Sequence, residues 1–218
     1  MIPLLIHIAS GFSKASVFIN IAFLAASLAF LSQRNITKRL IWIFVAWRFF
    51  YAAFLTGAQY VVWSHSQFTR IFTSAPVAFT AQTPEGLKPL LSLFHWRGGY
   101  FTFYSFAHFW FRFLLSLFSS LLFYAVLLFS RRYRKEMFAE GEPELALLSA
   151  LLVGWPGFVI FVPLAFSFAL LLSIVRLFIF KQPSTSIAYP FLIATVAFLL
   201  WHLMGDPISF FHLSVLRV

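Results

Sequence analysis

The chain has 218 residues, of which 61% are apolar and only 10% are Asp, Glu, Lys or Arg, whereas a soluble domain carries about 25% charged residues. This composition excludes a water-soluble single domain, and the 21% of aromatic residues, 32 of them Phe, suits an outer surface that faces lipid. The net charge of +10 predicts basic cytoplasmic loops and no nucleic-acid site, and the absence of cysteine excludes disulfides and Cys-ligated metals.

Six apolar stretches are expected to form helices in a bilayer, where about 20 residues cross a hydrocarbon core about 30 Å thick. In chain order they are residues 15–31, 40–63, 101–129, 145–155, 157–180 and 187–203. The apolar run from 145 to 180 is too long for one crossing, and Trp155-Pro156-Gly157 favours a turn inside it. We therefore predict an all-α, polytopic membrane bundle with about six transmembrane helices, forming one membrane domain over residues 1–218. Residues 2–12 are expected to extend the first helix.

The distribution of Lys and Arg predicts the orientation of these helices. With an extracytoplasmic N-terminus, nine basic residues lie in inner connections and five in outer segments, as the positive-inside rule favours. Residues 64–100 are then the one long extracytoplasmic connection. The expected location is the inner (plasma) membrane.

Polar and charged residues inside the predicted spans suggest a candidate binding site. Arg48 and Arg112 each need a partner within a membrane, and one stripe of a continuous α-helix would carry Ser105, His108, Arg112, Ser116 and Ser119. The stripe is either ordinary hydrogen bonding between helices or, with Arg48, His108 and Arg112, a site for a lipid phosphate or a partner's carboxylate. None of the six acidic residues lies within a span, which motivates the anion site.

The densest acidic segment follows the third span. Residues 131–135 hold four cations, and Glu136, Glu140, Glu142 and Glu144 come after them. These acids either cap the next helix from a solvated loop, or Glu144 is a partly buried carboxylate suited to acid–base chemistry. The six histidines lack metal-ligand spacing, so we expect no metal and no cofactor.

The C-terminal half resembles the prepilin (type IV leader) peptidases as an ordered series of motifs. Residues 141–155, GEPELALLSALLVGW, are similar to the stretch from the family's Gly-x-Gly-Asp loop to a Gly-Trp pair, and residues 187–192, IAYPFL, are similar to the start of its last helix. The resemblance covers residues 131–203.

The resemblance implies an intramembrane aspartic endopeptidase that cleaves the leaders of pilin-like precursors without a cofactor. Of the family's two aspartates, one position corresponds to Glu144, in the loop that begins at Gly141, and the other to Ser32. With Ser32 in place of one carboxylate, a dyad that activates water is incomplete. The first hypothesis is thus a divergent or inactive peptidase-like protein in which Glu144 is the candidate catalytic residue. The alternative is a noncatalytic membrane subunit that binds a partner helix or an anionic lipid through Arg48, His108 and Arg112.

Overall fold

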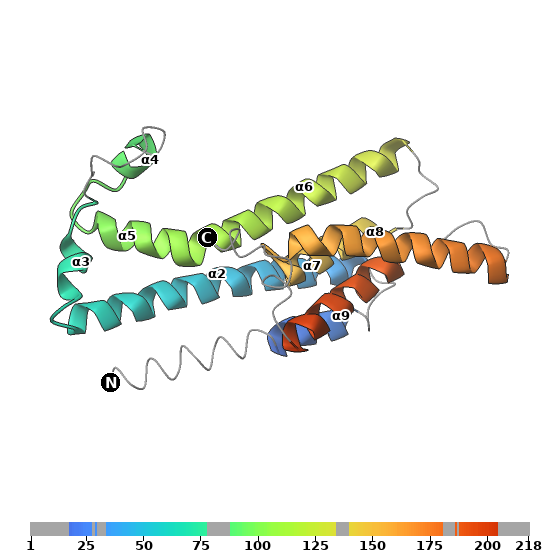
Figure 1. The fold of residues 1–218 in the computed structure, drawn as a ribbon, viewed down its shortest axis with the longest axis horizontal. Helices are drawn as coiled ribbons and strands as arrows, with labels where there is room; N and C mark the ends of the chain where they lie inside the picture. The colour runs from blue at the N-terminus through green and yellow to red at the C-terminus, as the bar shows by residue number, and fades with distance from the viewer. Residues whose placement is uncertain are drawn as a thin grey trace. The chain divides into compact units, whose positions relative to one another are not determined.

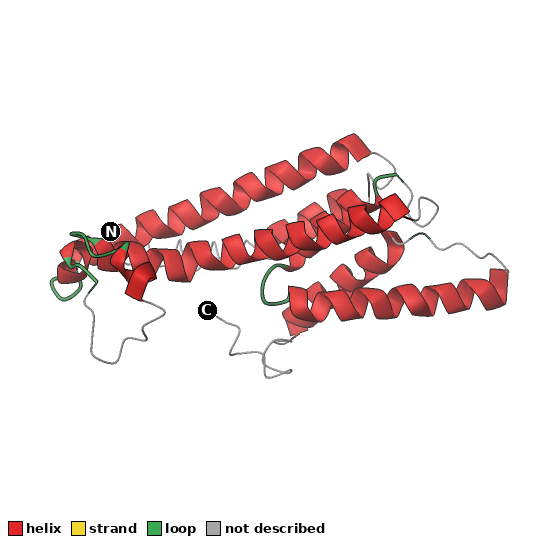
Figure 2. Ribbon diagram, turned by 90° about the horizontal axis from the view of Figure 1, so that it is seen from above, coloured by secondary structure: helices red, strands yellow, loops and turns green. Residues whose placement is uncertain are grey.

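The computed structural model describes residues 18–27, 29, 34–77, 88–133, 140–180, 186 and 188–204, and the regular elements among them are all helices (Figures 1 and 2). The chain divides into two compact units. Unit 1 comprises residues 1–15, 48–112 and 218, and unit 2 comprises residues 16–47 and 113–217. Residues 2–12, which are expected to extend the first helix, and the positions Ser32 and Glu136 lie outside the described residues.

Three of the described helices are long and apolar enough to cross a membrane: Asn35–His65, Gly99–Tyr133 and Phe158–Ile179. Two shorter apolar helices, Phe18–Ser27 and Ala188–Met204 (α9), overlap the first and last predicted spans. The helical, membrane-type fold follows from these elements, whereas the number of crossings stays a prediction.

The predicted turn at Trp155-Pro156-Gly157 separates two helices. Helix α7 runs over Glu142–Val153 and α8 over Phe158–Val175, followed by the π-helix η4 at Arg176–Phe180. Gly154 ends α7 with φ of +66°, a left-handed conformation that glycine adopts at little cost. With 12 residues, α7 is about 18 Å long, too short to cross a bilayer alone.

Helix α7 is the centre of unit 2. All of its residues from Glu142 to Leu152 are buried, because the sequence offers apolar side chains around its whole circumference. Large side chains such as Leu148 pack with Phe44 of α2 (Arg34–His65) and with Leu192 of α9. Elsewhere the contacts involve small residues, namely Ala146, Ala150, Ala165 and Ala194, which allow helix backbones to approach closely in a membrane protein.

Unit 1 is held together by aromatic side chains. Helices α3 (Arg70–Ser74) and α4 (Lys88–Ser92) lie in the predicted extracytoplasmic connection, and α5 (Gly99–Ser105) follows it. Trp63 near the end of α2 contacts four rings, those of Phe72, Tyr100, Phe101 and Tyr104. The Nε1–H of Trp110 donates a hydrogen bond of 3.0 Å to Oγ1 of Thr56. The described part of the connection is therefore ordered and packs against the C-terminal end of α2 and the start of α5.

Candidate functional site

Two carboxylates lie buried in the first turn of α7. Glu142 is 5% exposed and Glu144 is 2% exposed, whereas Glu140 just before them is exposed. Gly141 is the N-cap residue, with φ of +90°, and its carbonyl accepts the first helical hydrogen bond, 3.0 Å from the Leu145 N–H. Negative charge is favourable at this end of a helix, where free N–H groups point outwards.

Glu142 joins α7 to Ser186 and to the first residue of α9, Ala188. Its Oε1 accepts a hydrogen bond from Oγ of Ser186 and another, of 3.5 Å, from the backbone N–H of Ala188. These two hydrogen bonds hold the carboxylate against the N-terminal end of α9. Glu142 therefore has a role in closing unit 2, a role that the sequence does not reveal because Ser186 is 44 residues away.

We expect Glu142→Gln to lower the free energy of unfolding by about 1 kcal/mol, because the amide keeps an acceptor oxygen but loses the charge that strengthens both hydrogen bonds. Chemical unfolding in detergent, followed by circular dichroism, measures the change. The exposed neighbour supplies the control, since Glu140→Gln should change stability by less than about 0.5 kcal/mol. Equal effects of the two variants would contradict the role of Glu142.

Glu144 lies at a groove of about 430 Å³ within unit 2. The groove is lined by residues of α2, α6 (Phe111–Tyr133) and α7. They are Lys38, Ile41, Trp42, Val45, Leu117, Leu121, Tyr124, Glu144, Leu147 and Leu151. Each helix contributes residues spaced three, four or seven apart, which is the spacing of one helical face.

The chemistry of this groove is apolar apart from three groups. Glu144 is its one carboxylate and Lys38 its one cation, and Tyr124 adds a hydroxyl group. Trp42 remains 73% exposed and Leu121 47% exposed, so part of the lining is accessible from outside the unit. Such a site suits an apolar chain that carries a polar or charged group near Glu144.

Among the described residues, the groove does not supply the carboxylate pair that an aspartic mechanism requires. Glu144 is the only acid in the lining, and the carboxylate of Glu142 is hydrogen-bonded to Ser186 and Ala188. Ser32, the second motif position, lies outside the described residues. A lone carboxylate can still bind a cation or transfer a proton.

The predicted polar stripe along the third span is wrong. Ser105, Ser116 and Ser119 are buried, whereas His108 and Arg112 are exposed. A π-helix, η2 at Phe106–Trp110, interrupts the α-helical repeat here and rotates the faces on its two sides relative to each other.

The three residues predicted to bind an anion all belong to unit 1. Arg48 is half-buried on α2, and Arg112 is exposed at the start of α6. The ring of His108 stacks on Tyr104 with centroids 4.1 Å apart, and its Nδ1 lies 3.0 Å from the Tyr104 carbonyl oxygen. Their joint binding of an anion stays a prediction.

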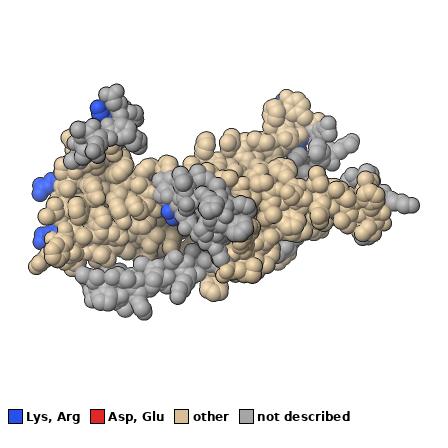
Figure 3. All heavy atoms as spheres, viewed as in Figure 1, with Lys and Arg blue, Asp and Glu red and all other residues tan. Residues whose placement is uncertain are grey.

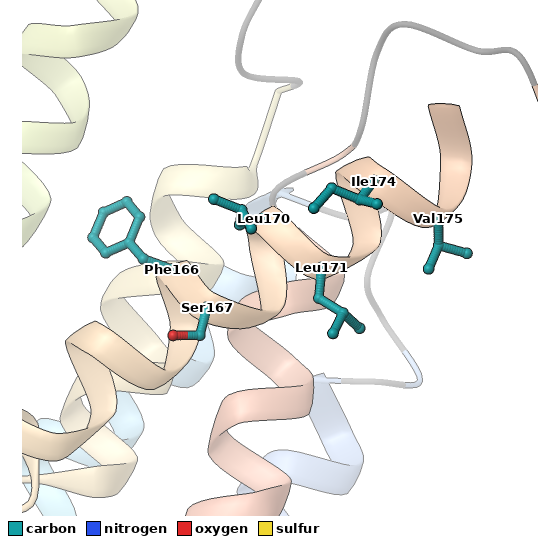
Figure 4. A pocket seen from close by; sticks show the side chains of 6 residues that line it. All are labelled: Phe166, Ser167, Leu170, Leu171, Ile174 and Val175. Carbon is teal, nitrogen blue, oxygen red and sulfur yellow. The ribbon is translucent and has the colours of Figure 1, made fainter. Parts of the chain in front are cut away.

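A second hollow, of about 500 Å³, lies along α8. Figure 4 shows that all six lining side chains come from this one helix, and Phe166, Leu170 and Leu171 among them are more than half exposed. Its one polar side chain, Ser167, donates a hydrogen bond of 2.8 Å to the Pro163 carbonyl. We interpret this face as a lipid-facing surface.

The sequence named Glu144 as a candidate residue but did not indicate the other residues that line the groove. The sequence does contain a signal for the α2 side of the groove, namely the helical spacing that places Lys38, Ile41, Trp42 and Val45 on one face. That pattern alone does not tell a groove from a packed helix interface. No family model, curated protein or solved structure matches this chain significantly.

Proposed function

We propose that this chain is a multi-pass inner-membrane protein, similar to prepilin leader peptidases but divergent and noncatalytic, which holds an apolar helix of a pilin-like client. The observation that supports the proposal is the groove lined by α2, α6 and α7, with Glu144 among its lining residues. An N-terminus outside and the basic connections inside would place Glu144 at the cytoplasmic side.

The apolar part of the groove favours a helix as its occupant. The groove follows two turns of α2, from Lys38 to Val45, and two turns of α6, from Leu117 to Tyr124. A client helix that lies against these faces would bury its side chains among Ile41, Val45 and Leu121. Close packing of this kind drives helix association in membranes.

Glu144 would select the charge of the client. A buried carboxylate in largely apolar surroundings favours a ligand that brings a cation next to its apolar segment. Lys38 also lines the groove and would repel a client cation placed beside it. The client's cation would therefore lie next to Glu144, and this preference would define the register of the client helix. The absence of a second carboxylate from the described lining supports holding the client rather than cleaving it.

The test is photocrosslinking of a pilin-like precursor to the full-length protein. We expect a photoreactive amino acid at Leu121 to form an adduct with the precursor without cleavage of its leader, and Glu144→Gln to reduce the adduct several-fold. A photoreactive residue at Leu170 of α8 is the control for lipid-facing positions, and Glu140→Gln is the matched charge control.

Two results would overturn this proposal. If Leu121 gives no more adduct than Leu170, the groove does not hold the client. If the leader is cleaved and Glu144→Gln abolishes the cleavage at normal protein level, the chain is an active peptidase instead.

A second candidate function is binding of a partner helix or an anionic lipid through Arg48, His108 and Arg112. The charge of unit 1 favours it, because its described residues contain five Lys or Arg residues and no Asp or Glu. A defect caused by Arg112→Leu, with unchanged crosslinking at Leu121, would support this function.

A further inference from the structure

The extracytoplasmic connection carries apolar side chains that the protein itself leaves uncovered. We call residues 66–77 the α3 segment and residues 88–98 the α4 segment. In these segments Phe68 is 89% exposed, Ile71 and Leu93 are 68% exposed, and Trp96 is 54% exposed. Helices α3 and α4 have five residues each, so neither can cross a bilayer. Exposed apolar surface of this extent needs a partner other than water.

These side chains are displayed on an ordered framework. The N–H of Val77 donates to the Phe94 carbonyl at 3.4 Å, and the N–H of Tyr100 donates to the Ala75 carbonyl at 3.1 Å. Nδ1 of His95 lies 2.9 Å from the Val77 carbonyl oxygen. The two segments are therefore tied to each other, and the exposed side chains belong to one body.

Basic residues accompany the apolar ones. Arg70, Lys88 and Arg97 are exposed on the same two segments, and Figure 3 shows Lys and Arg side chains on this part of unit 1. No acidic residue occurs in the described part of unit 1. Exposed aromatic side chains with neighbouring arginines are typical of the level of lipid headgroups.

The length of the adjoining helix places the two segments at that level. The apolar helix Asn35–His65 has 31 residues and is about 46 Å long, which exceeds the hydrocarbon core of about 30 Å and matches the full bilayer of about 40–45 Å. Its C-terminal turns, together with Trp63, would lie among the headgroups, and the α3 segment begins directly after them.

We infer that the α3 and α4 segments form a membrane-interface surface, in which Phe68, Ile71, Leu93 and Trp96 enter the boundary between headgroups and acyl chains. Arg70 and Arg97 bind lipid phosphates beside them, since a guanidinium group can donate two hydrogen bonds to one phosphate. The partner of this surface is the bilayer leaflet at which α2 ends. The inference is independent of the groove and of a pilin-like client.

The test uses the absence of cysteine from the chain, because a single introduced cysteine can be labelled uniquely. Phe68→Cys, Ile71→Cys and Leu93→Cys are each spin-labelled in the full-length protein in nanodiscs of phosphatidylcholine and phosphatidylglycerol. Gln67→Cys, at an exposed polar neighbour, is the control. We expect the three apolar sites to be several-fold more accessible to oxygen, relative to a water-soluble nickel complex, than residue 67.

The phosphate contacts are tested by adding Arg70→Gln and Arg97→Gln to the labelled Phe68→Cys protein. We expect the ratio of oxygen to nickel accessibility to fall several-fold while the circular dichroism spectrum is unchanged. Three results would overturn the inference. The first is water-like accessibility at all four labelled sites. The second is exclusion of both oxygen and the nickel complex from the apolar sites, which a covering protein or a second copy would cause. The third is an unchanged accessibility ratio in the variant that lacks both arginines.

Discussion

Gly99→Ala is expected to destabilise unit 1 by more than about 4 kcal/mol, a value that few single substitutions reach. A Cβ atom at this position would lie 1.6 Å from the carbonyl oxygen of Phe94 and 2.6 Å from its carbonyl carbon. Both atoms belong to the backbone, so no rotamer change relieves the contact. The adjacent Gly98 has φ of +89°, a conformation that glycine adopts at little cost.

The measurement is chemical unfolding of the purified protein in detergent, followed by the fluorescence of its tryptophans, which include Trp63 and Trp96. Gly57→Ala is the matched control, because Gly57 lies within α2 and a Cβ there has no neighbour within 4 Å. That variant should be stabilised by about 0.5–1 kcal/mol, since alanine favours a helix. A Gly99→Ala protein as stable as the Gly57→Ala protein would show that the Phe94 contact is not as close as described.

Local sequence signals predicted the helix ends because the same residues determine where a helix begins and ends in the structure. The turn at Trp155-Pro156-Gly157 is one example, since adjacent proline and glycine residues favour a turn between helices. The first turn of α7 is another, where Pro143 and two glutamates follow Gly141 in an arrangement typical of a helix start.

The errors come from features that depend on distant contacts. The stripe from Ser105 to Ser119 assumed an uninterrupted α-helix, and the π-helix Phe106–Trp110 changes the register by altering hydrogen bonds that composition does not encode. The prediction of a connection over residues 64–100 did not include the short helices α3 and α4, because five residues give too little periodicity to recognise.

The candidate site was predictable only in part. The sequence indicates Glu144 through its position at the start of an apolar helix, but the groove needs faces of α2 and α6 that are far apart in the chain. The same holds for the fixed position of Glu142, which depends on Ser186 and Ala188. The distinction between one buried carboxylate that lines a groove and another that holds a loop comes from the structure alone.

Gly157→Ala is expected to destabilise unit 2 by about 1–3 kcal/mol through overpacking, with partial rescue by a second substitution. A Cβ atom here would lie 2.4 Å from Cζ and 2.9 Å from Cε1 of the Phe198 ring, and 3.0 Å from Cγ1 of Val153. Phe198 is 3% exposed and stacks on His202 with an interplanar angle of 9°, so its ring has little room to turn away.

Phe198→Leu removes the ring atoms that the new methyl group would meet, and a double-mutant cycle in detergent then measures the coupling. Alone, Phe198→Leu should also destabilise the protein, because it leaves a cavity. If the contact causes the loss, the double variant should be more stable than the sum of the single effects predicts, by about 1 kcal/mol or more. Strict additivity would contradict the contact with Phe198 as the cause of the loss, since Gly157 has φ of −57°, a conformation that alanine also adopts without strain. The cycle therefore tests the packing of the start of α8 against α9, in which Gly157 lies next to Phe198.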